Sequence, residues 1–325
     1  MFETFLQALI TGLAVGSLYA LIALGYTMVY GILKFINFAH SDVFVLGAWI
    51  SYEISKKAGW AGTDGAPWYA GLFVLVASMF MCAVVGFTVE RLAYKPLRKA
   101  PRLNVLIAAI AVSMFLQNVG QLDFLFGTRP QGMPVLLKDS EIAAIGGSVA
   151  VTAADGTVTP AVPPVIIRLV DVIGATTAIV LMFALDFLVF HTRLGRAMRA
   201  VSHNPATASL MGVNVDRVIS ITFIIGAALA AAAGFLYSQK YSGLNQPAAP
   251  VWVLLGLKAF VAAVVGGIGN IRGAMLGGIL IGLLEFFGVT YFGADLRDVY
   301  VFAILIIVLL VRPGGLLGKA TIEKV

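Results

Sequence analysis

The chain has 325 residues, of which 60% are hydrophobic and only 12% are charged, and its formal net charge is +6. Soluble domains carry about 25% charged residues, so this composition excludes a water-soluble globular protein and requires lipid to solvate part of the surface. The basic residues lie between apolar runs, which indicates orientation in a membrane and argues against nucleic acid as a partner.

About nine apolar stretches approach the length of roughly 20 residues that a membrane span needs. In chain order they are 6–30, 36–54, 68–90, 104–126, 172–191, 217–239, 251–269, 273–292 and 299–312. No basic n-region precedes the first stretch, so we expect a retained helix and no cleaved signal peptide. The sequence therefore predicts an all-α fold, in which residues 1–325 form one polytopic transmembrane helical bundle of about 8–10 spans.

The second stretch begins with a polar cluster that includes Asn37, His40 and Asp42. We expect the segment 31–42 to be a broken or re-entrant helix, which a membrane protein tolerates only inside protein or beside a water-filled cavity. Asn37 and His40 could line a gate or pathway, or could satisfy the helix break. Asp42 is expected to cap the helix that follows.

Further polar residues lie within the later stretches. Gln117 and Asn118 could line a path, but hydrogen bonding between helices is the favoured role. Lys258 and Glu285 stand on adjacent stretches, and an ionisable residue costs about 2.5–3.5 kcal/mol at a helix centre. We predict that these two residues pair inside the bundle or face a polar cavity, either to fix helix packing or to contact a substrate.

Three other acids lie near the ends of the stretches, and we expect them to be interfacial. They are Glu90, Asp123 and Asp186.

Basic loops set the expected orientation. The loops 90–103 and 192–217 and the tail after residue 311 carry most of the arginine and lysine, so we place them in the cytoplasm and the N-terminus outside. The longest outer segment, 127–170, contains an Asp155-Gly156 turn between alternating stretches. This pattern is typical of a small β-hairpin, although an irregular loop fits equally well.

The polar segment 192–216 is the most informative part of the sequence. It predicts two short helices, with Asn204 as the N-cap before Pro205 at the first helical position. An amphipathic helix below a bundle is suited to a partner's groove, whereas an ordinary basic loop would contact lipid headgroups. The apolar face would comprise Ala200, Val201, Ala208, Leu210 and Met211.

The motifs GRAMRA at 195–200 and ASLMGVN at 208–214 resemble the cytoplasmic coupling segment of branched-chain amino acid ABC importer permeases. Segments 16–31, 36–42, 258–278 and 312–318 are also similar to that family, in the same order along the chain. Ser41 stands where family members usually have glycine. The outer segment 127–170 matches no family motif.

The resemblance implies a type II ABC importer with several subunits in the inner membrane. Two permease subunits, homologous or identical, form the pore; two cytoplasmic ABC ATPase subunits drive it; and a periplasmic substrate-binding protein delivers the ligand. The chain has no G-x-x-x-x-G-K-[ST] phosphate loop, so ATP and Mg would be used by the ATPase subunits and no cofactor is expected on this chain.

The resemblance also implies inward transport of leucine, isoleucine and valine, with urea or short amides as alternative substrates. The alternatives from other classes are a secondary transporter and an intramembrane hydrolase or acyltransferase, and the enzyme is disfavoured. No H-E-x-x-H or G-x-S-x-G motif is present and the three histidines lack metal-ligand spacing, so we predict neither a catalytic nor a metal site.

The residues that would carry these roles fall into two sets. The ATPase-coupling set is Gly195, Arg196, Arg199, Ala200, Asn204, Ala208 and Gly212. The set for the translocation path or an intramembrane polar network is Asn37, His40, Gln117, Asn118, Lys258, Asn270 and Glu285.

Overall fold

A computed structural model describes residues 2–60, 66–98, 100–137, 140–147, 151–152, 158–159 and 164–318. Within these ranges, each predicted apolar stretch contains one helix, which confirms an all-α membrane bundle. The helices are α1 (Phe2–Leu33), α2 (His40–Lys57), α3 (Ala70–Val89), α5 (Arg102–Gly120), α6 (Leu169–His191), α9 (Val215–Lys240), α10 (Pro250–Gly266), α11 (Ile271–Phe292) and α12 (Arg297–Val311).

Six of these helices are long and apolar enough to cross a membrane: α1, α3 with its extension to Leu97, α5, α6, α9 and α11. Helices α10 and α12 have 17 and 15 residues, and α2 has 18 residues with four charged side chains at its two ends. The number of helices in the predicted stretches therefore agrees with the prediction of about nine. Among the described residues, only six of these helices have the length and hydropathy expected of an independent membrane span.

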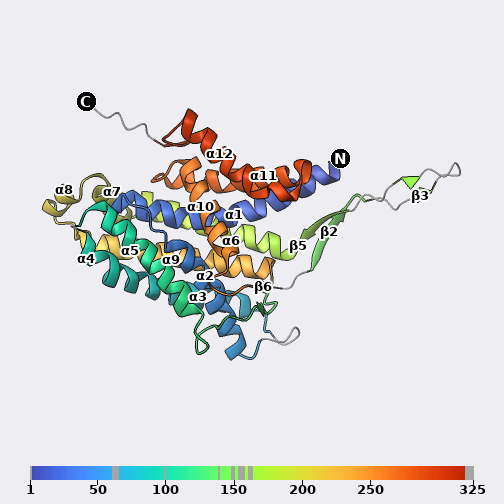
Figure 1. The fold of residues 1–325 in the computed structure, drawn as a ribbon, viewed down its shortest axis with the longest axis horizontal. Helices are drawn as coiled ribbons and strands as arrows, with labels where there is room; N and C mark the ends of the chain where they lie inside the picture. The colour runs from blue at the N-terminus through green and yellow to red at the C-terminus, as the bar shows by residue number, and fades with distance from the viewer. Residues whose placement is uncertain are drawn as a thin grey trace.

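The short elements connect these helices. They are the π-helix η1 (Glu90–Tyr94) with α4 (Lys95–Leu97), the pair α7 (Arg193–His203) and α8 (Pro205–Leu210), and the 3₁₀ turn η2 (Ala294–Leu296). Figure 1 shows α7 and α8 at one extremity of the bundle, which we call the α8 end. The N-terminus and the strands β2, β3 and β5 lie at the opposite extremity, the strand end.

Three antiparallel strand pairs occupy the strand end. They are β1 (Gln131–Gly132) with β6 (Gly243–Leu244), β2 (Glu141–Ile145) with β5 (Val165–Arg168), and β3 (Val151–Thr152) with β4 (Val158–Thr159). The β3–β4 pair lies where the hairpin was predicted, but its Asp155-Gly156 turn is outside the described residues. The longer β2–β5 ribbon was not predicted, and it projects from the helices in Figure 1.

Helices α1 and α9 form the centre of the bundle. Helix α1 packs against α11, α9, α6 and α10, and α9 packs against α3, α2 and α1. Helices α1 and α11 approach so closely that a Cβ atom on Gly282 would overlap the backbone of Gly16. Small residues at the contact allow this approach, as is usual for membrane helices.

The peripheral helices present large apolar side chains outward. Phe80 on α3, Phe115 on α5 and Phe183 on α6 are all exposed, although these helices are long and apolar enough to cross a membrane. A water-exposed surface of this kind would be unstable, so these faces are assigned to lipid.

Candidate functional site

The predicted coupling segment forms two short helices separated at Asn204. The Asn204 Oδ1 atom accepts hydrogen bonds from the backbone N–H groups of Ala206 at 3.0 Å and Thr207 at 3.1 Å. These bonds satisfy two of the amide groups that the first turn of α8 leaves without helical partners. The predicted N-cap before Pro205 is therefore confirmed.

Helix α7 is attached to the ends of two long helices. A Cβ atom on Gly195 would overlap the carbonyl oxygen of Val189, so glycine is required where α7 turns back under α6. Arg199 donates a hydrogen bond to the same carbonyl oxygen, and its guanidinium lies 5.4 Å from the ring centre of Phe190. Ser202 Oγ donates to the carbonyl oxygen of Gly31, at 2.6 Å, near the end of α1.

The two arginines of α7 differ in their contacts. Arg199 contacts Val189 and Phe190 at the end of α6 and is exposed. Arg196 is also exposed on α7. The coupling role of both arginines stays a prediction.

The residues predicted to form one apolar face in this segment do not all face the same way. Val201 and Ala208 are buried against the bundle, whereas Leu210 and Met211 are 87% and 80% exposed. Gly212 ends α8 with a φ of +81°, a conformation that L-residues other than glycine rarely adopt. The prediction of a single face was wrong because α8 turns away from α7, so its tip projects from the bundle.

A cavity of about 490 Å³ at the α8 end lies between the end of α1, the η1 turn, α7 and the starts of α8 and α9. A second cavity of about 320 Å³ lies between α7 and α8 themselves. Its lining includes Ala200, His203, Asn204, Thr207, Ala208 and Met211.

The segment between α1 and α2 re-enters the bundle, as the sequence predicted. The chain reverses at Lys34, whose φ is +57°, and the ring of His40 then lies 3.2 Å from the carbonyl oxygen of Ile22. Ile22 precedes Leu33 by 11 residues, which is about 16 Å of helix. Asn37 is buried in this segment, where Tyr94 Oη donates a hydrogen bond of 2.5 Å to its Oδ1 atom.

The polar residues beside this segment hold helices together. Gln117 Nε2 on α5 donates to Asp42 Oδ1 on α2 at 2.9 Å, which confirms the predicted interhelical role of Gln117. The predicted capping role of Asp42 was wrong, because the N-terminus of α2 has no side-chain cap and the carboxylate turns to α5 instead. Asn118 donates to the carbonyl oxygen of Met114 in its own helix, at 2.7 Å, and makes no interhelical hydrogen bond within the described part of the chain.

Near the strand end, four charged side chains join α10, α11 and α12. Lys258 Nζ lies 2.8 Å from Glu285 Oε1 and 2.6 Å from Asp298 Oδ1, and Arg297 also pairs with Glu285. Lys258 is 4% exposed and Glu285 is 0% exposed. The predicted Lys258–Glu285 pair is present, and two charges of each sign make this cluster neutral.

Arg297 and Asp298 were missed by the sequence analysis. They stand at the start of α12, just before an apolar stretch, where charged residues normally mark the membrane boundary. The sequence did contain one indication of such residues. A buried lysine and a buried glutamate each need partners that offset their desolvation, so further charged residues are expected nearby.

Asn270 has a structural position in the turn between α10 and α11. Its Oδ1 accepts from Gly273 N at 3.3 Å as the N-cap of α11, and its Nδ2 donates to the carbonyl oxygen of Leu317 at 2.7 Å. These bonds join the turn to the C-terminal tail.

Glu90 was predicted to be interfacial, but its carboxylate is fully buried in η1. It pairs with Arg98 and accepts a hydrogen bond of 2.7 Å from Ser220 Oγ. Arg98 reaches Asp216 as well, at 2.5 Å, so these residues connect the end of α3 to the start of α9. Glu90 and Tyr94 both belong to the π-helical turn η1, and both are buried. A π-helical turn changes which side of the helix the following residues face.

The other two acids lie at the surface, and their interfacial position stays a prediction. Asp186 forms a surface ion pair with Arg272 at 2.9 Å, and Asp123 is exposed after α5.

The residues predicted for the translocation path or polar network therefore lie in three separate places, and the third also contains the coupling segment. Asn37, His40 and Gln117 surround the start of α2, Lys258 and Glu285 lie near the strand end, and Asn270 and the coupling segment lie at the α8 end.

The chain is similar to known proteins along most of its length. Residues 8–309 match the family described as the branched-chain amino acid transport system / permease component. The chain belongs to this permease family. It is 41% identical to the high-affinity branched-chain amino acid transport system permease protein BraD of Pseudomonas aeruginosa over 99% of this chain and 98% of BraD.

Two further relatives are similar to the chain over different lengths. LivH of Escherichia coli K12, a high-affinity branched-chain amino acid transport system permease protein, is 41% identical over 100% of this chain and 99% of its own length. The ribose import permease protein RbsC of the same strain is 29% identical over 33% of this chain and 34% of RbsC. No solved structure matched the chain.

Membership in the permease family confirms the resemblance stated from the sequence motifs. The matched region includes the re-entrant segment, the coupling segment and the buried charge cluster. The chain is therefore a multi-pass membrane permease.

Proposed function

We propose that this chain is the membrane-spanning permease subunit of an ATP-driven importer that moves branched-chain amino acids inward across the inner membrane. The observation that carries this proposal is the 41% identity, over essentially the whole chain, to permease proteins of high-affinity branched-chain amino acid transport systems. Urea or short amides would be the alternative substrates within the same family.

The coupling segment supports a separate ATPase as the source of energy. Leu210 and Met211 project from the α8 end, and an exposed apolar tip is suited to a hydrophobic groove on a partner. Helix α7 is bonded to the ends of α1 and α6, so displacement of the tip would be transmitted to two membrane helices. ATP and Mg would be bound by two such ATPase subunits on the cytoplasmic side.

The remaining partners follow from this role. A second permease subunit, homologous or identical, would complete the pore, and a periplasmic binding protein would deliver the amino acid to the strand end. The α8 end would then be cytoplasmic, as the basic loops predict.

The substrate is tested by uptake in a host that lacks its own branched-chain amino acid importers. Co-expression of this chain with its partner subunits should give uptake of radiolabelled leucine that vanadate inhibits. Excess isoleucine or valine should compete, whereas urea and acetamide should not. Vanadate-insensitive uptake would indicate a secondary transporter and would contradict the proposal.

The coupling role is tested by co-purification of the ATPase subunits. Leu210→Glu and Arg196→Glu should each reduce the ATPase recovered with the permease, because they change the apolar tip or the surface charge of the segment. Leu122→Glu introduces the same charge at an exposed leucine after α5, at the opposite end, and serves as the matched control. Unchanged ATPase recovery with both α7–α8 variants would contradict this assignment.

A further inference from the structure

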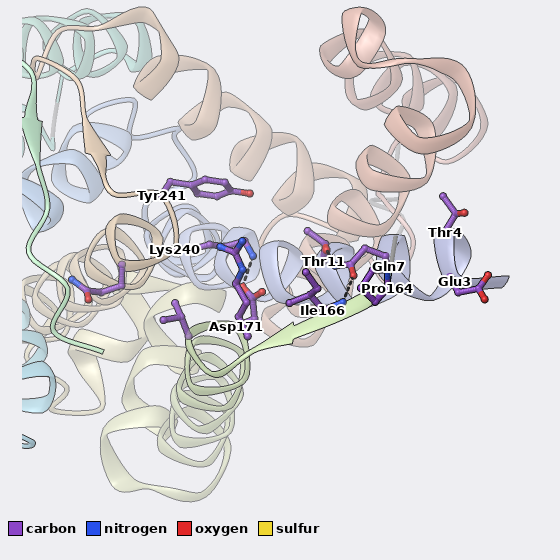
Figure 2. Close-up of a pocket in the computed structure, with 12 residues that line it drawn as sticks. Glu3, Thr4, Gln7, Thr11, Pro164, Ile166, Asp171, Lys240 and Tyr241 are labelled. Carbon is purple, nitrogen blue, oxygen red and sulfur yellow. Dashed lines mark hydrogen bonds and ion pairs between the residues drawn. The ribbon is translucent and has the colours of Figure 1, made fainter. Parts of the chain in front are cut away.

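A pocket of about 490 Å³ with both polar and apolar lining residues opens at the strand end. Its walls come from the start of α1, from β5 with the start of α6, and from the end of α9. Figure 2 shows the side chains of Lys240 and Asp171 pointing toward each other in this pocket, while Glu3 and Thr4 lie toward the start of α1. The volume is within the range of about 300–1,000 Å³ that is typical of small-molecule sites.

The walls of the pocket are held by specific hydrogen bonds. Gln7 Oε1 on α1 accepts from the backbone N–H of Ile166 on β5 at 2.9 Å, and Gln7 Nε2 donates to Thr11 Oγ1 at 3.1 Å. These bonds fix β5 beside α1, so the pocket does not depend on the projecting part of the strand ribbon.

The ion pair in the pocket is largely removed from solvent. Lys240 Nζ pairs with Asp171 Oδ1, and their side chains are 14% and 11% exposed. A lysine ammonium has three N–H donors, so one carboxylate oxygen leaves Lys240 with donors for a further acceptor. Because the pair is shielded from water, a ligand that contacts both residues would gain more than it would at an exposed ion pair.

The charges lining the pocket are balanced. Glu3 and Asp171 are acidic, and Arg168 and Lys240 are basic. A ligand that carries only a positive or only a negative charge would meet repulsion from two of these four residues. A zwitterion can place its carboxylate toward a base and its ammonium toward an acid, so it matches the lining without adding net charge.

The same pocket has an apolar wall. Pro164, Ile166 and Val170 line it beside the ion pair. An aliphatic side chain placed against these residues would be removed from water, which is favourable in proportion to the apolar area buried. Charged groups on one side and aliphatic groups on the other correspond to the two ends of a small apolar amino acid.

The pocket also adjoins the buried charge cluster. Tyr241 lines the pocket. Burial raises the pKa of the Tyr241 hydroxyl, and the neighbouring Arg297 guanidinium opposes that shift. Since Arg297 pairs with Glu285, the pocket lies beside the residues that join α10, α11 and α12.

We propose that this pocket is an acceptor site for a free zwitterionic α-amino acid with an aliphatic side chain. Lys240 would bind its carboxylate, Asp171 its ammonium group, and the Pro164–Ile166–Val170 wall its side chain. The inference rests on the proposed function, because it identifies where the permease receives the amino acid at the strand end before the amino acid enters the bundle.

The test uses the complete transporter in lipid nanodiscs, without ATP and without the binding protein. Saturation-transfer NMR detects weak binding through the methyl signals of the ligand, and the probe is L-leucine. Two analogues serve as comparison: leucinamide, which lacks the carboxylate, and 4-methyl-2-oxopentanoate, which lacks the ammonium group. Leucine should give the strongest transfer, and each analogue should bind about tenfold more weakly because it loses a charge-assisted hydrogen bond.

Substitutions of Lys240 and Asp171 test whether the saturation transfer to leucine comes from this pocket. Lys240→Met and Asp171→Asn should each weaken leucine binding about tenfold, and the exchanged pair K240D/D171K should recover part of it. Arg272→Met and Asp186→Asn break a matched ion pair at the other end of the bundle and should leave the signal unchanged. The exchanged pair also separates loss of binding from loss of folding, because it retains the charge balance.

Equal transfer from leucine and both analogues would overturn the inference, as would full leucine binding by the Lys240 and Asp171 variants. Vanadate-sensitive leucine uptake, measured separately with the binding protein present, keeps the two proposals apart. If the native transporter takes up leucine but shows no pocket binding, the acceptor site is wrong and the proposed function stands. If uptake itself is absent, the proposed function fails.

Discussion

Replacement of Glu285 by glutamine removes the fully buried anion that pairs with both Lys258 and Arg297. Removal of one partner from a buried ion pair costs about 3–5 kcal/mol, because the remaining charge stays desolvated. Lys258 keeps Asp298 at 2.6 Å, and the Arg297 side chain is 41% exposed and can recruit water. We therefore expect a loss at the low end, about 3 kcal/mol.

The measurement is thermal unfolding of the detergent-solubilised transporter, followed by the amount of intact complex that elutes from a size-exclusion column. Glu285→Gln should lower the Tm by several degrees and should also reduce the yield of assembled complex. The double variant Lys258→Met with Glu285→Met is the matched control. It leaves Arg297 and Asp298, which have opposite charges, so its Tm should lie closer to that of the native protein.

Two results would refute this reasoning. One is a Glu285→Gln variant that unfolds at the native temperature, which would mean that the anion does not offset the buried cations. The other is a double variant that is less stable than Glu285→Gln, which would mean that packing at the two positions outweighs charge.

Three further substitutions test local features of the fold. Asn204→Ala removes the cap of α8 and should destabilise that helix by about 1 kcal/mol, seen as weaker ATPase co-purification; unchanged recovery would contradict a role for the cap. Gly212→Ala places a Cβ atom at a φ of +81°, costs about 1–2 kcal/mol, and should increase proteolytic cleavage near α8; native resistance would count against it. Tyr94→Phe leaves the buried Asn37 side chain without its donor and should cost about 1–3 kcal/mol in thermal unfolding, whereas the exposed Tyr69→Phe control should change little; equal effects would refute the assignment.

Local sequence patterns predicted the features that depend on neighbouring residues. The N-cap at Asn204 follows from an asparagine directly before a proline that begins a helix, and the structure has both hydrogen bonds. The re-entry between α1 and α2 follows from polar residues at the start of an apolar stretch, because such residues need partners inside protein. The pairing of Lys258 with Glu285, 27 residues apart, is not a local feature, and it was predicted from the cost of leaving either charge alone inside the bundle.

The errors concern directions that only packing decides. Asp42 has the residue type and position of a cap, yet its carboxylate faces Gln117 because α5 lies beside α2. Glu90 lies near the end of an apolar stretch, yet the π-helical turn and Arg98 place it in the interior. Ala208 and Leu210 were assigned to one face, but α8 turns so that one is buried and the other is exposed.

The sequence by itself determined that this chain is an all-α membrane protein, where most of its helices begin and end, and which family it belongs to. Hydrophobic length and capping residues are local properties, so they can be recognised in one dimension. Only the tertiary structure brought Lys240 to Asp171, and Arg297 with Asp298 to Lys258 and Glu285. The helices that carry these residues are brought together by contacts between α1, α6 and α9 and among α10, α11 and α12. Such contacts join residues that are distant in the chain. Helix packing therefore decides which buried charges become partners.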